Sequence, residues 1–280
     1  MDNVDTRQYM MRLKKILDVY VAICEKHHLR YYLSSGTLLG AVRHSGFIPW
    51  DDDIDVDMPM EDYKIFCKIA QKELGERYFF QTYNTDKVLN VPWGRIRENG
   101  TTSMPVRDAE FDIHYGVDID IFPMVGIYNN KLLAKMQEKM FSLIVTLLQA
   151  DYYKIYHHWS PSKFVKGLYA LPRSLRKSFV NIFGLFVYRN FRDAENGFTL
   201  YEYSCKRNPA YYKESIKLNF EGSLYDAPAK WDAVLKEAYG DYMTLPPLDQ
   251  RNGHADSMGE IIFDLNKDFK EYKREMGYIK

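Results

Sequence analysis

One run of acidic residues, Trp50-Asp51-Asp52-Asp53-Ile54-Asp55-Val56-Asp57, limits the structures that this chain can adopt more than any other segment. Its acids alternate with aliphatic residues up to Met58, which is typical of a β-strand, and Pro59 is expected to end the strand. Side chains two residues apart along a strand lie on the same face, about 6–7 Å from each other. One face of this strand should therefore carry four carboxylates: Asp51, Asp53, Asp55 and Asp57.

Carboxylates held this close repel one another, by roughly 4 kcal/mol for two charges 4 Å apart near a protein surface. A divalent cation removes that cost, and a site made only of oxygen ligands favours Mg²⁺ or Mn²⁺. A solvated acidic loop is the first alternative, but the alternation with Ile54 and Val56 is typical of a strand. An EF-hand calcium loop would need Gly at Val56 and Glu at Asp62. Pairing with arginines would not need so many acids on one face, so we expect a metal site.

A turn of small residues, Leu33-Ser34-Ser35-Gly36-Thr37-Leu38, lies upstream of the acidic strand. We expect it to connect a short strand to a short helix, where backbone N–H groups and a helix N-terminus attract phosphate. By itself this signal is weak, because many such turns only connect elements. A phosphate-binding turn beside metal carboxylates, however, is what the transfer of a phosphoryl-type group requires.

A second acidic strand is expected at Val117-Asp118-Ile119-Asp120-Ile121-Phe122, ended by Pro123. A carboxylate on this strand would complete the metal shell or accept a proton from an attacking hydroxyl. The alternative is a pair of acids that faces water at a sheet edge. Arg95 and Arg97 share one face of a further expected strand, where they either clamp a diphosphate or pair with the acidic cluster.

The rest of the pattern predicts an α/β (α+β) fold with a mixed sheet, a helical insertion and C-terminal helices. We expect the core with the metal site over 1–129, the helical insertion over 130–206, the C-terminal part of the core over 207–256 and a loosely ordered tail over 257–280. The expected helices are 5–28, 38–42, 60–74, 131–150, 162–169, 175–189, 193–206 and 229–239. The expected strands are 31–33, 51–58, 78–83, 93–98 and 116–122.

Charge and cysteine content narrow the classes of function. The 38 basic and 38 acidic residues cancel, which argues against nucleic acid as a partner. Three cysteines without a CxxC pair exclude a disulfide scaffold and a zinc ribbon and fit a reducing compartment. Neither a signal peptide nor a run of about 18 apolar residues is visible, so we expect a cytoplasmic protein.

The stretch from Ser35 to Asp55 closely resembles the signature of the LicD family, which includes the fukutin-related transferases. The resemblance continues at Ile119–Pro123 and Tyr239–Pro247. It implies a nucleotidyltransferase-like fold and a LicD-type phosphotransferase, an enzyme that moves a substituted phosphate group from a CDP-activated donor to a sugar hydroxyl with Mg²⁺ or Mn²⁺.

The resemblance also assigns roles to residues. Asp53 and Asp55 match the metal carboxylates, Asp51 is a further metal ligand, and Asp120 matches the third acid, which is both a ligand and catalytic. Asp118 is an extra acid, so the choice between Asp118 and Asp120 stays open. The residues expected to bind substrate are Ser35, Gly36, Thr37, Arg43, His44, Arg95 and Arg97.

LicD proteins typically move phosphocholine from CDP-choline to cell-surface glycans, and fukutin relatives move ribitol phosphate. We therefore expect phosphocholine transfer to lipopolysaccharide, teichoic acid or capsule. The alternatives are CDP-ribitol, CDP-glycerol or CDP-ethanolamine as donor, a nucleotidyltransferase that makes the donor from CTP, and an inactive binding module. Aromatic residues are 15% of the chain and could enclose a choline group by cation–π contact, although no spacing identifies which ones.

The segment 163–191 mixes basic residues with Phe, Ile and Leu. A basic amphipathic helix can lie on an anionic membrane surface, such as the inner face of the membrane that carries lipid-linked glycan acceptors. Alternatively, the helix packs its apolar face on the core. Both interpretations stay open at this point.

Overall fold

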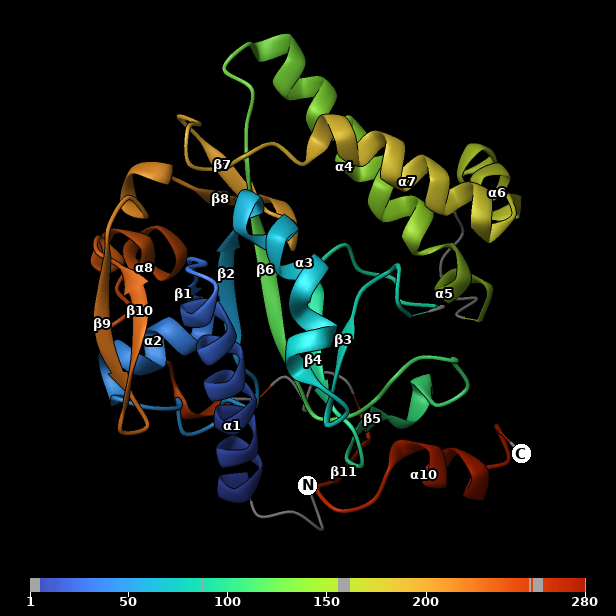
Figure 1. Cartoon of the computed structure of the whole chain (residues 1–280), viewed down its shortest axis with the longest axis horizontal. Coiled ribbons are helices and arrows are strands. Elements are labelled where there is room, and N and C mark those ends of the chain that lie inside the picture. The colour runs from blue at the N-terminus through green and yellow to red at the C-terminus, as the bar shows by residue number, and fades with distance from the viewer. Residues whose placement is uncertain (1–5, 87, 156–161, 252, 254–258, 280) are drawn as a thin grey trace.

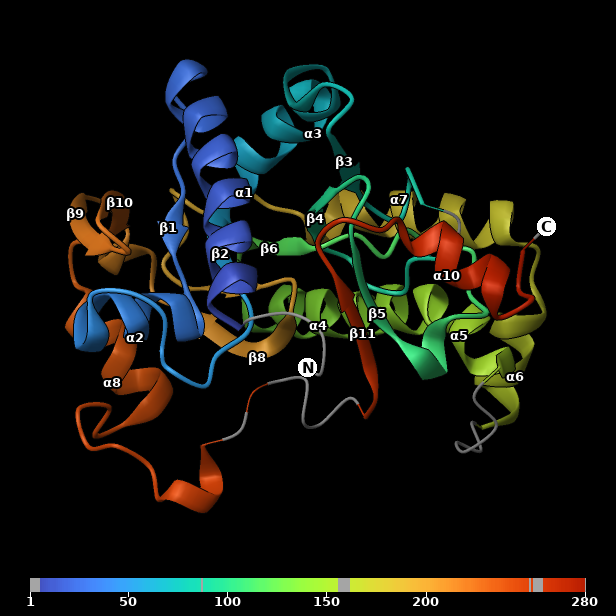
Figure 2. The same cartoon turned by 90° about the horizontal axis from the view of Figure 1, so that it is seen from below.

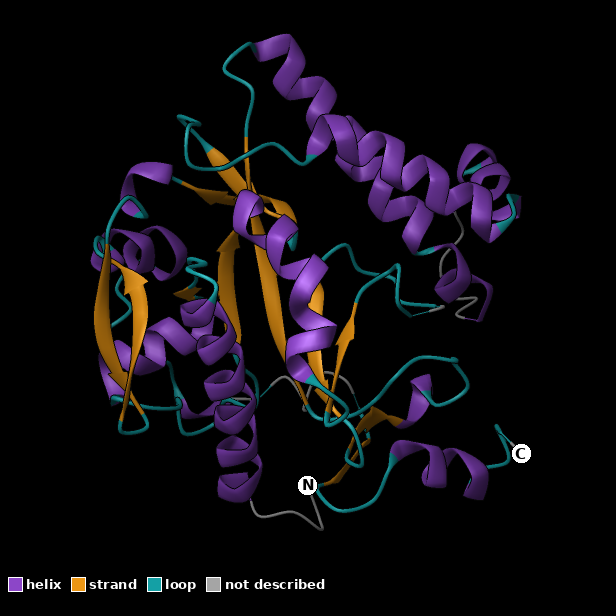
Figure 3. Ribbon diagram, in the orientation of Figure 1, coloured by secondary structure: helices purple, strands orange, loops and turns teal. Residues whose placement is uncertain are grey.

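The computed structural model describes residues 6–86, 88–155, 162–251, 253 and 259–279 and confirms the predicted α/β fold with a mixed sheet (Figures 1 and 3). The main sheet has the strand order β1-β2-β6-β4-β3, and β7 and β8 extend it beside β6. Only the β2–β6 pair is parallel within this sheet. Its strands are β1 (Tyr32–Leu33), β2 (Asp55–Pro59), β3 (Tyr78–Gln81), β4 (Gly94–Glu98), β6 (Asp118–Gly126), β7 (Gly197–Thr199) and β8 (Glu202–Arg207).

Two helices, α1 (Thr6–Lys26) and α3 (Met60–Leu74), cover one face of this sheet (Figure 1). Helix α1 buries Leu13, Leu17 and Tyr20, whose spacing places them on one side of a helix. The alternate residues of β2, β4 and β6 that point to the helices are apolar and join the same core: Val56, Met58, Ile96, Ile119 and Ile121. The acids of the same strands must then point to the opposite face, where Figure 2 shows the segment after α8.

Strand β2 begins later than the sequence predicts. The backbone N–H of Asp51 donates to the carbonyl of Ile48 at 2.9 Å, which closes a turn, and the strand starts only at Asp55. Asp51 and Asp53 therefore reach the site from a loop rather than from the face of a strand.

Pro123 lies inside β6 and does not end it. Strand β4 pairs with β6 up to Ile121, and β7 pairs with it from Met124 onward. Pro123 thus stands at the junction of the two partners, where its missing N–H removes no ladder hydrogen bond to either strand.

The helical insertion follows β6 and is shorter than expected. Its helices are α4 (Lys131–Leu148), α5 (Ala150–Ile155), α6 (Lys163–Ala170) and α7 (Arg173–Val187), and α4 packs along α7 (Figure 3). The helix expected over 193–206 is wrong, because this segment forms β7 and β8. At Gly197 a Cβ would lie 2.4 Å from the ring of Phe191, so close backbone approach fixes this return to the sheet.

The C-terminal region contributes to two further layers. The hairpin β9–β10 lies against α2 and α8, and β11 pairs with β5 beside α10. The tail expected to be loosely ordered over 257–280 is therefore structured from β11 onward, although residues 257 and 258 lie outside the described residues. These elements are α2 (Ser35–His44), β5 (Thr102–Pro105), β9 (Ser215–Phe220), β10 (Ser223–Pro228), α8 (Trp231–Tyr239), β11 (Ile261–Asp264) and α10 (Phe269–Glu275).

Across the described parts of the chain, no helix is both long enough and apolar enough to cross a membrane.

His114 gives the fold a pH dependence. Its Nδ1 accepts from the Gly116 N–H at 3.0 Å, its Nε2 bonds to Asn99 Oδ1 at 2.7 Å, and its ring packs on Phe269 of α10. Burial, with smaller effects of Arg97 and Lys270, lowers the pKa of His114 to about 3. The unfolded chain takes up this proton near pH 6.5, so the free energy of unfolding falls as the pH drops below that value.

We expect the free energy of unfolding to fall by up to about 2 kcal/mol between about pH 7 and pH 5 through this group. Urea unfolding at a series of pH values measures it. The variant His114→Gln should lose most of this dependence, and an unchanged slope in the variant would contradict the assignment.

Candidate active site

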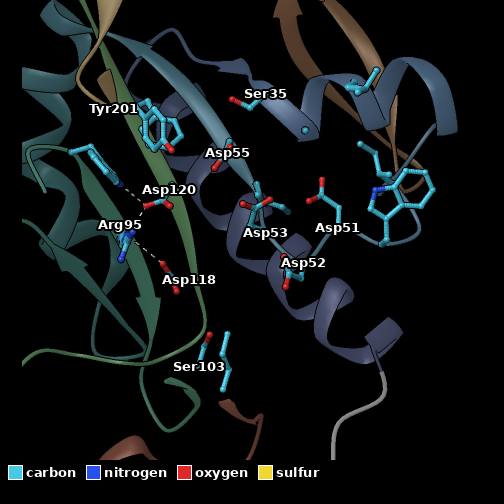
Figure 4. Close-up of a pocket in the computed structure, with 18 of the residues that line it drawn as sticks. Ser35, Asp51, Asp52, Asp53, Asp55, Arg95, Ser103, Asp118, Asp120 and Tyr201 are labelled. Carbon is cyan, nitrogen blue, oxygen red and sulfur yellow. Dashed lines mark hydrogen bonds and ion pairs between the residues drawn. The ribbon is translucent and has the colours of Figure 1, made fainter. Parts of the chain in front are cut away.

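A cavity of about 1170 Å³ opens on the polar face of the sheet (Figure 4). The acidic loop, strands β2, β4 and β6, the first turn of α2 and the segment after α8 all contribute to its wall. Of the predicted site residues, those that line it are Ser35, Gly36, Arg43, Asp51, Asp53, Asp55, Arg95, Arg97, Asp118 and Asp120.

The centre of the cavity is a row of charges across three neighbouring strands. Asp55 of β2 pairs in register with Asp120 of β6, which pairs in register with Arg95 of β4. Side chains of directly paired residues lie on the same face of a sheet. The sheet therefore places two carboxylates and a guanidinium side by side at the cavity floor (Figure 4).

Arg95 and Arg97 of β4 both pair with acids of β6. Arg95 Nε donates to Asp120 Oδ1 at 2.6 Å, and the indole N–H of Trp93 donates to the same oxygen at 2.8 Å. Arg97 Nη1 donates to Asp118 Oδ1 at 2.8 Å. Of the two interpretations of these arginines, this geometry favours pairing with the acidic cluster over a diphosphate clamp.

The two acids of β6, Asp118 and Asp120, differ in their partners. Asp118 lies between the two arginines. Its Oδ1 accepts from Arg97, and its Oδ2 is 3.6 Å from Arg95 Nε. Asp120 is the acid that neighbours Asp55, and within the described chain its Oδ2 forms no hydrogen bond. Both oxygens of Asp118 thus face an arginine, whereas Asp120 keeps one oxygen without a hydrogen-bond partner among the described residues.

In the described part of the chain, the carboxylate of Asp55 has no compensating cation. Burial, together with Asp53, Asp120 and Asp51, raises its pKa well above the usual range. No hydrogen bond or ion pair to its carboxylate occurs among the described residues. Asp57, two residues further along the strand, instead forms an ion pair with Arg207, whose Nε lies 2.8 Å from Asp57 Oδ2. The strand therefore holds one buried acid that is compensated, Asp57, and one half-buried acid that is not, Asp55.

This donor set fits a hard divalent cation, because a cation would remove the repulsion that Asp55 experiences from its neighbours. In the described part of the chain, no three His, Cys, Asp or Glu side chains are already grouped around one point. Binding would therefore require side-chain movement, and the predicted ligands that line the cavity are Asp51, Asp53, Asp55 and Asp120.

The first turn of α2 touches the acidic loop directly. A Cβ at Gly36 would lie 2.6 Å from Asp51 Oδ2, and Ser35 has a positive φ of 47°. Thr37 is buried outside the cavity and accepts the backbone N–H of Asp55 at 2.9 Å, so it positions β2. His44 also lies outside the cavity and packs edge-on against Trp50. Contact with substrate thus stays a prediction for Ser35 and Gly36.

Two arginines, Arg43 and Arg251, flank the acidic loop. Arg43 Nη1 donates to the Tyr242 carbonyl at 2.7 Å, and Arg251 lies over the ring of Trp50, 5.2 Å from its centroid. Burial and the nearby charge of Arg251 lower the pKa of Arg43. Neither arginine forms an ion pair within the described residues, so both can compensate an anion. Sequence reasoning missed Arg251, because no local motif marks it.

Three aromatic rings form a wall beside Asp120. Trp93, Phe122 and Tyr201 pack pairwise with centroids 5.4 Å apart. Trp93 and Phe122 are buried, whereas Tyr201 is 55% exposed. Tyr201 lies in the turn between β7 and β8 (Figure 4). The sequence could not identify this wall, because its third ring depends on strands expected to be a helix.

Comparison with known proteins bears on the same residues. Residues 28–142 match the LicD/FKTN/FKRP nucleotidyltransferase domain. The lipopolysaccharide cholinephosphotransferase LicD of Haemophilus influenzae is 27% identical over 273 residues, which cover 91% of this chain and 97% of that protein. The human ribitol 5-phosphate transferase FKRP is 42% identical over 135 residues, which cover 41% of this chain and 27% of that protein. The chain thus spans nearly all of the first relative and about a quarter of the second.

Proposed function

Because this chain belongs to the LicD family through residues 28–142, we propose that it transfers phosphocholine from a CDP-activated donor to a sugar hydroxyl of a cell-surface glycan. The named relatives support the broader class, an enzyme that transfers substituted phosphate groups. The observation that carries the proposal is the pairing of Asp55 with Asp120 at the floor of one cavity, beside an aromatic wall.

Phosphocholine is favoured over ribitol phosphate for two reasons. The similarity to the cholinephosphotransferase extends over nearly the whole chain, whereas that to the ribitol 5-phosphate transferase covers 41% of it. A quaternary ammonium group also suits an aromatic ring beside carboxylates, because ring faces attract cations. Tyr201 offers such a ring near Asp120 and Asp55, whose charges raise its pKa after the larger effect of burial. A neutral polyol would gain little from this wall.

The donor phosphates need positive charge that the β4 arginines do not supply. Asp53 and Asp55, with Asp51, would hold Mg²⁺, which when bound would neutralise charge on the donor diphosphate. Arg43 lines the cavity on the other side of the acidic loop and has no acidic partner among the described residues. In the proposal, Arg43 and the Ser35–Gly36 turn hold the outer phosphate oxygens.

Asp120 takes the role of orienting the acceptor. Arg95 and Trp93 fix its Oδ1, which leaves Oδ2 to accept the hydrogen bond of the sugar hydroxyl. The hydroxyl oxygen then forms a bond to the phosphorus that carries choline, the bond from that phosphorus to the CMP oxygen breaks, and CMP leaves. The proton of the hydroxyl passes to Asp120.

We expect Mg²⁺-dependent release of CMP from CDP-choline when a glycan acceptor is present. Asp53→Asn and Asp55→Asn should each lower the rate at least about 100-fold, because each removes negative charge that the cation needs. Asp193→Asn, an exposed acid outside the cavity, is the matched control and should retain the rate. Chromatographic measurement of CMP provides the readout.

Two results would contradict the proposal. Near-normal rates in both aspartate variants would exclude the assigned site. Release of pyrophosphate from CTP and phosphocholine, without CMP release from any CDP donor, would show a nucleotidyltransferase instead. CDP-ribitol, CDP-glycerol and CDP-ethanolamine are tested as alternative donors in the same CMP-release assay.

Tyr201 tests the identity of the substituent. We expect Tyr201→Ala to raise KM for CDP-choline about tenfold, through the loss of a cation–π contact, and to leave KM for CDP-glycerol unchanged. Tyr201→Phe keeps the ring and should behave as wild type. Equal changes for both donors would argue against a choline subsite at this wall.

A further inference from the structure

The segment 152–192 carries charges of one sign only. It contains eight basic residues and no Asp or Glu, which leaves 30 basic and 38 acidic residues in the rest of the chain. The segment therefore has a net charge of +8 against −8 elsewhere, although the chain as a whole is neutral. The basic residues are Lys154, Lys163, Lys166, Arg173, Arg176, Lys177, Arg189 and Arg192.

Some of these basic residues have partners within the protein, and two lysines form no ion pair with any described residue. Arg176 is buried and pairs with Asp151 at 2.5 Å, and Arg189 stacks on Tyr128. Lys163 and Lys166, on α6, are exposed and form no ion pair with any described residue. These lysines are free to face an anionic partner.

Exposed apolar side chains accompany the basic residues. On α7, Leu175, Ile182 and Leu185 are 42%, 57% and 86% exposed, at a spacing that places them along one face of the helix. Phe164, between the two lysines of α6, is 70% exposed. The opposite face of α7 packs on α4, so the outward face is apolar although it meets solvent.

The helical insertion that carries this surface also reaches the cavity. Tyr152 of α5 lines the cavity and stacks on Phe111 with a centroid distance of 4.9 Å. Figure 1 shows that α5 follows α4 on the side of the insertion nearest β5. The insertion therefore contributes to the cavity wall through α5.

We propose that the basic–apolar face, defined as Lys163, Phe164, Lys166, Leu175, Ile182 and Leu185, docks on an anionic lipid surface. Basic residues around exposed apolar ones suit the interface of such a membrane, which attracts the cations and receives the apolar side chains. A second copy of the chain fits less well, because a symmetric dimer through this face would bring like charges together. The proposal does not depend on the reaction assigned to the cavity.

Flotation with vesicles tests it on the full chain. We expect binding to phosphatidylcholine vesicles that contain phosphatidylglycerol, no binding to phosphatidylcholine alone, and loss of binding at about 0.5 M NaCl. Lys163→Glu with Lys166→Glu, and separately Ile182→Ser with Leu185→Ser, should each lower the partition coefficient at least about tenfold.

Helix α3 provides the matched control, because it has an exposed apolar residue and exposed lysines on another side of the molecule. Ile65, 47% exposed, is changed to Ser together with Lys68→Glu and Lys72→Glu, and this variant should bind as wild type.

Three results would overturn the proposal: no binding of the wild type, equal binding to neutral vesicles, or equal losses in the test and control variants. Self-association in sedimentation that the 182/185 variant abolishes, without vesicle binding, would assign the face to a dimer. CMP release with a water-soluble acceptor should be unchanged in the variants, so failure of docking and failure of the proposed reaction are distinguishable.

Discussion

The parallel pairing of β2 with β6 is the constraint on which the rest of this structure depends. It places Asp55 directly beside Asp120 and buries the alternate aliphatic residues of both strands under α1 and α3. Because side chains alternate along a strand, the apolar face cannot be buried without bringing the acids together on the other face. The fold therefore creates the electrostatic cost that the proposed cation would relieve.

Arginines compensate most of the acids that β2 and β6 carry on this face. Arg207 neutralises Asp57, Arg97 pairs with Asp118, and Arg95 holds one oxygen of Asp120. Asp55 is left as a half-buried carboxylate surrounded by acids. A purely structural cluster would be expected to pair every buried charge, because an uncompensated one is costly. The uncompensated acid is thus the strongest internal sign of a ligand.

The sequence predicted the elements that depend on local pattern and missed those that depend on pairing. Helix α3 follows from periodicity and from Pro59 before it, and β4 and β6 follow from alternation. The register of Asp55 with Asp120 is a tertiary contact that one strand alone does not specify. The segment 193–206 was expected to be a helix, but pairing with β6 makes it strands, and Tyr201 was missed with it. Arg251 was missed because it comes to Trp50 only through the fold.

The most direct test of the account is the thermal unfolding of wild type and Asp55→Asn with and without Mg²⁺. We predict that saturating Mg²⁺ stabilises the wild type, by about 2.7 kcal/mol at one hundred times its dissociation constant, and leaves Asp55→Asn unchanged. Without the cation, Asp55→Asn should be at least as stable as wild type, because the variant removes a partly desolvated charge that its neighbours repel. Asp57→Asn should be less stable yet keep the Mg²⁺ response. A wild type that does not respond to Mg²⁺ or Mn²⁺, or an equal response in Asp55→Asn, would contradict the central claim.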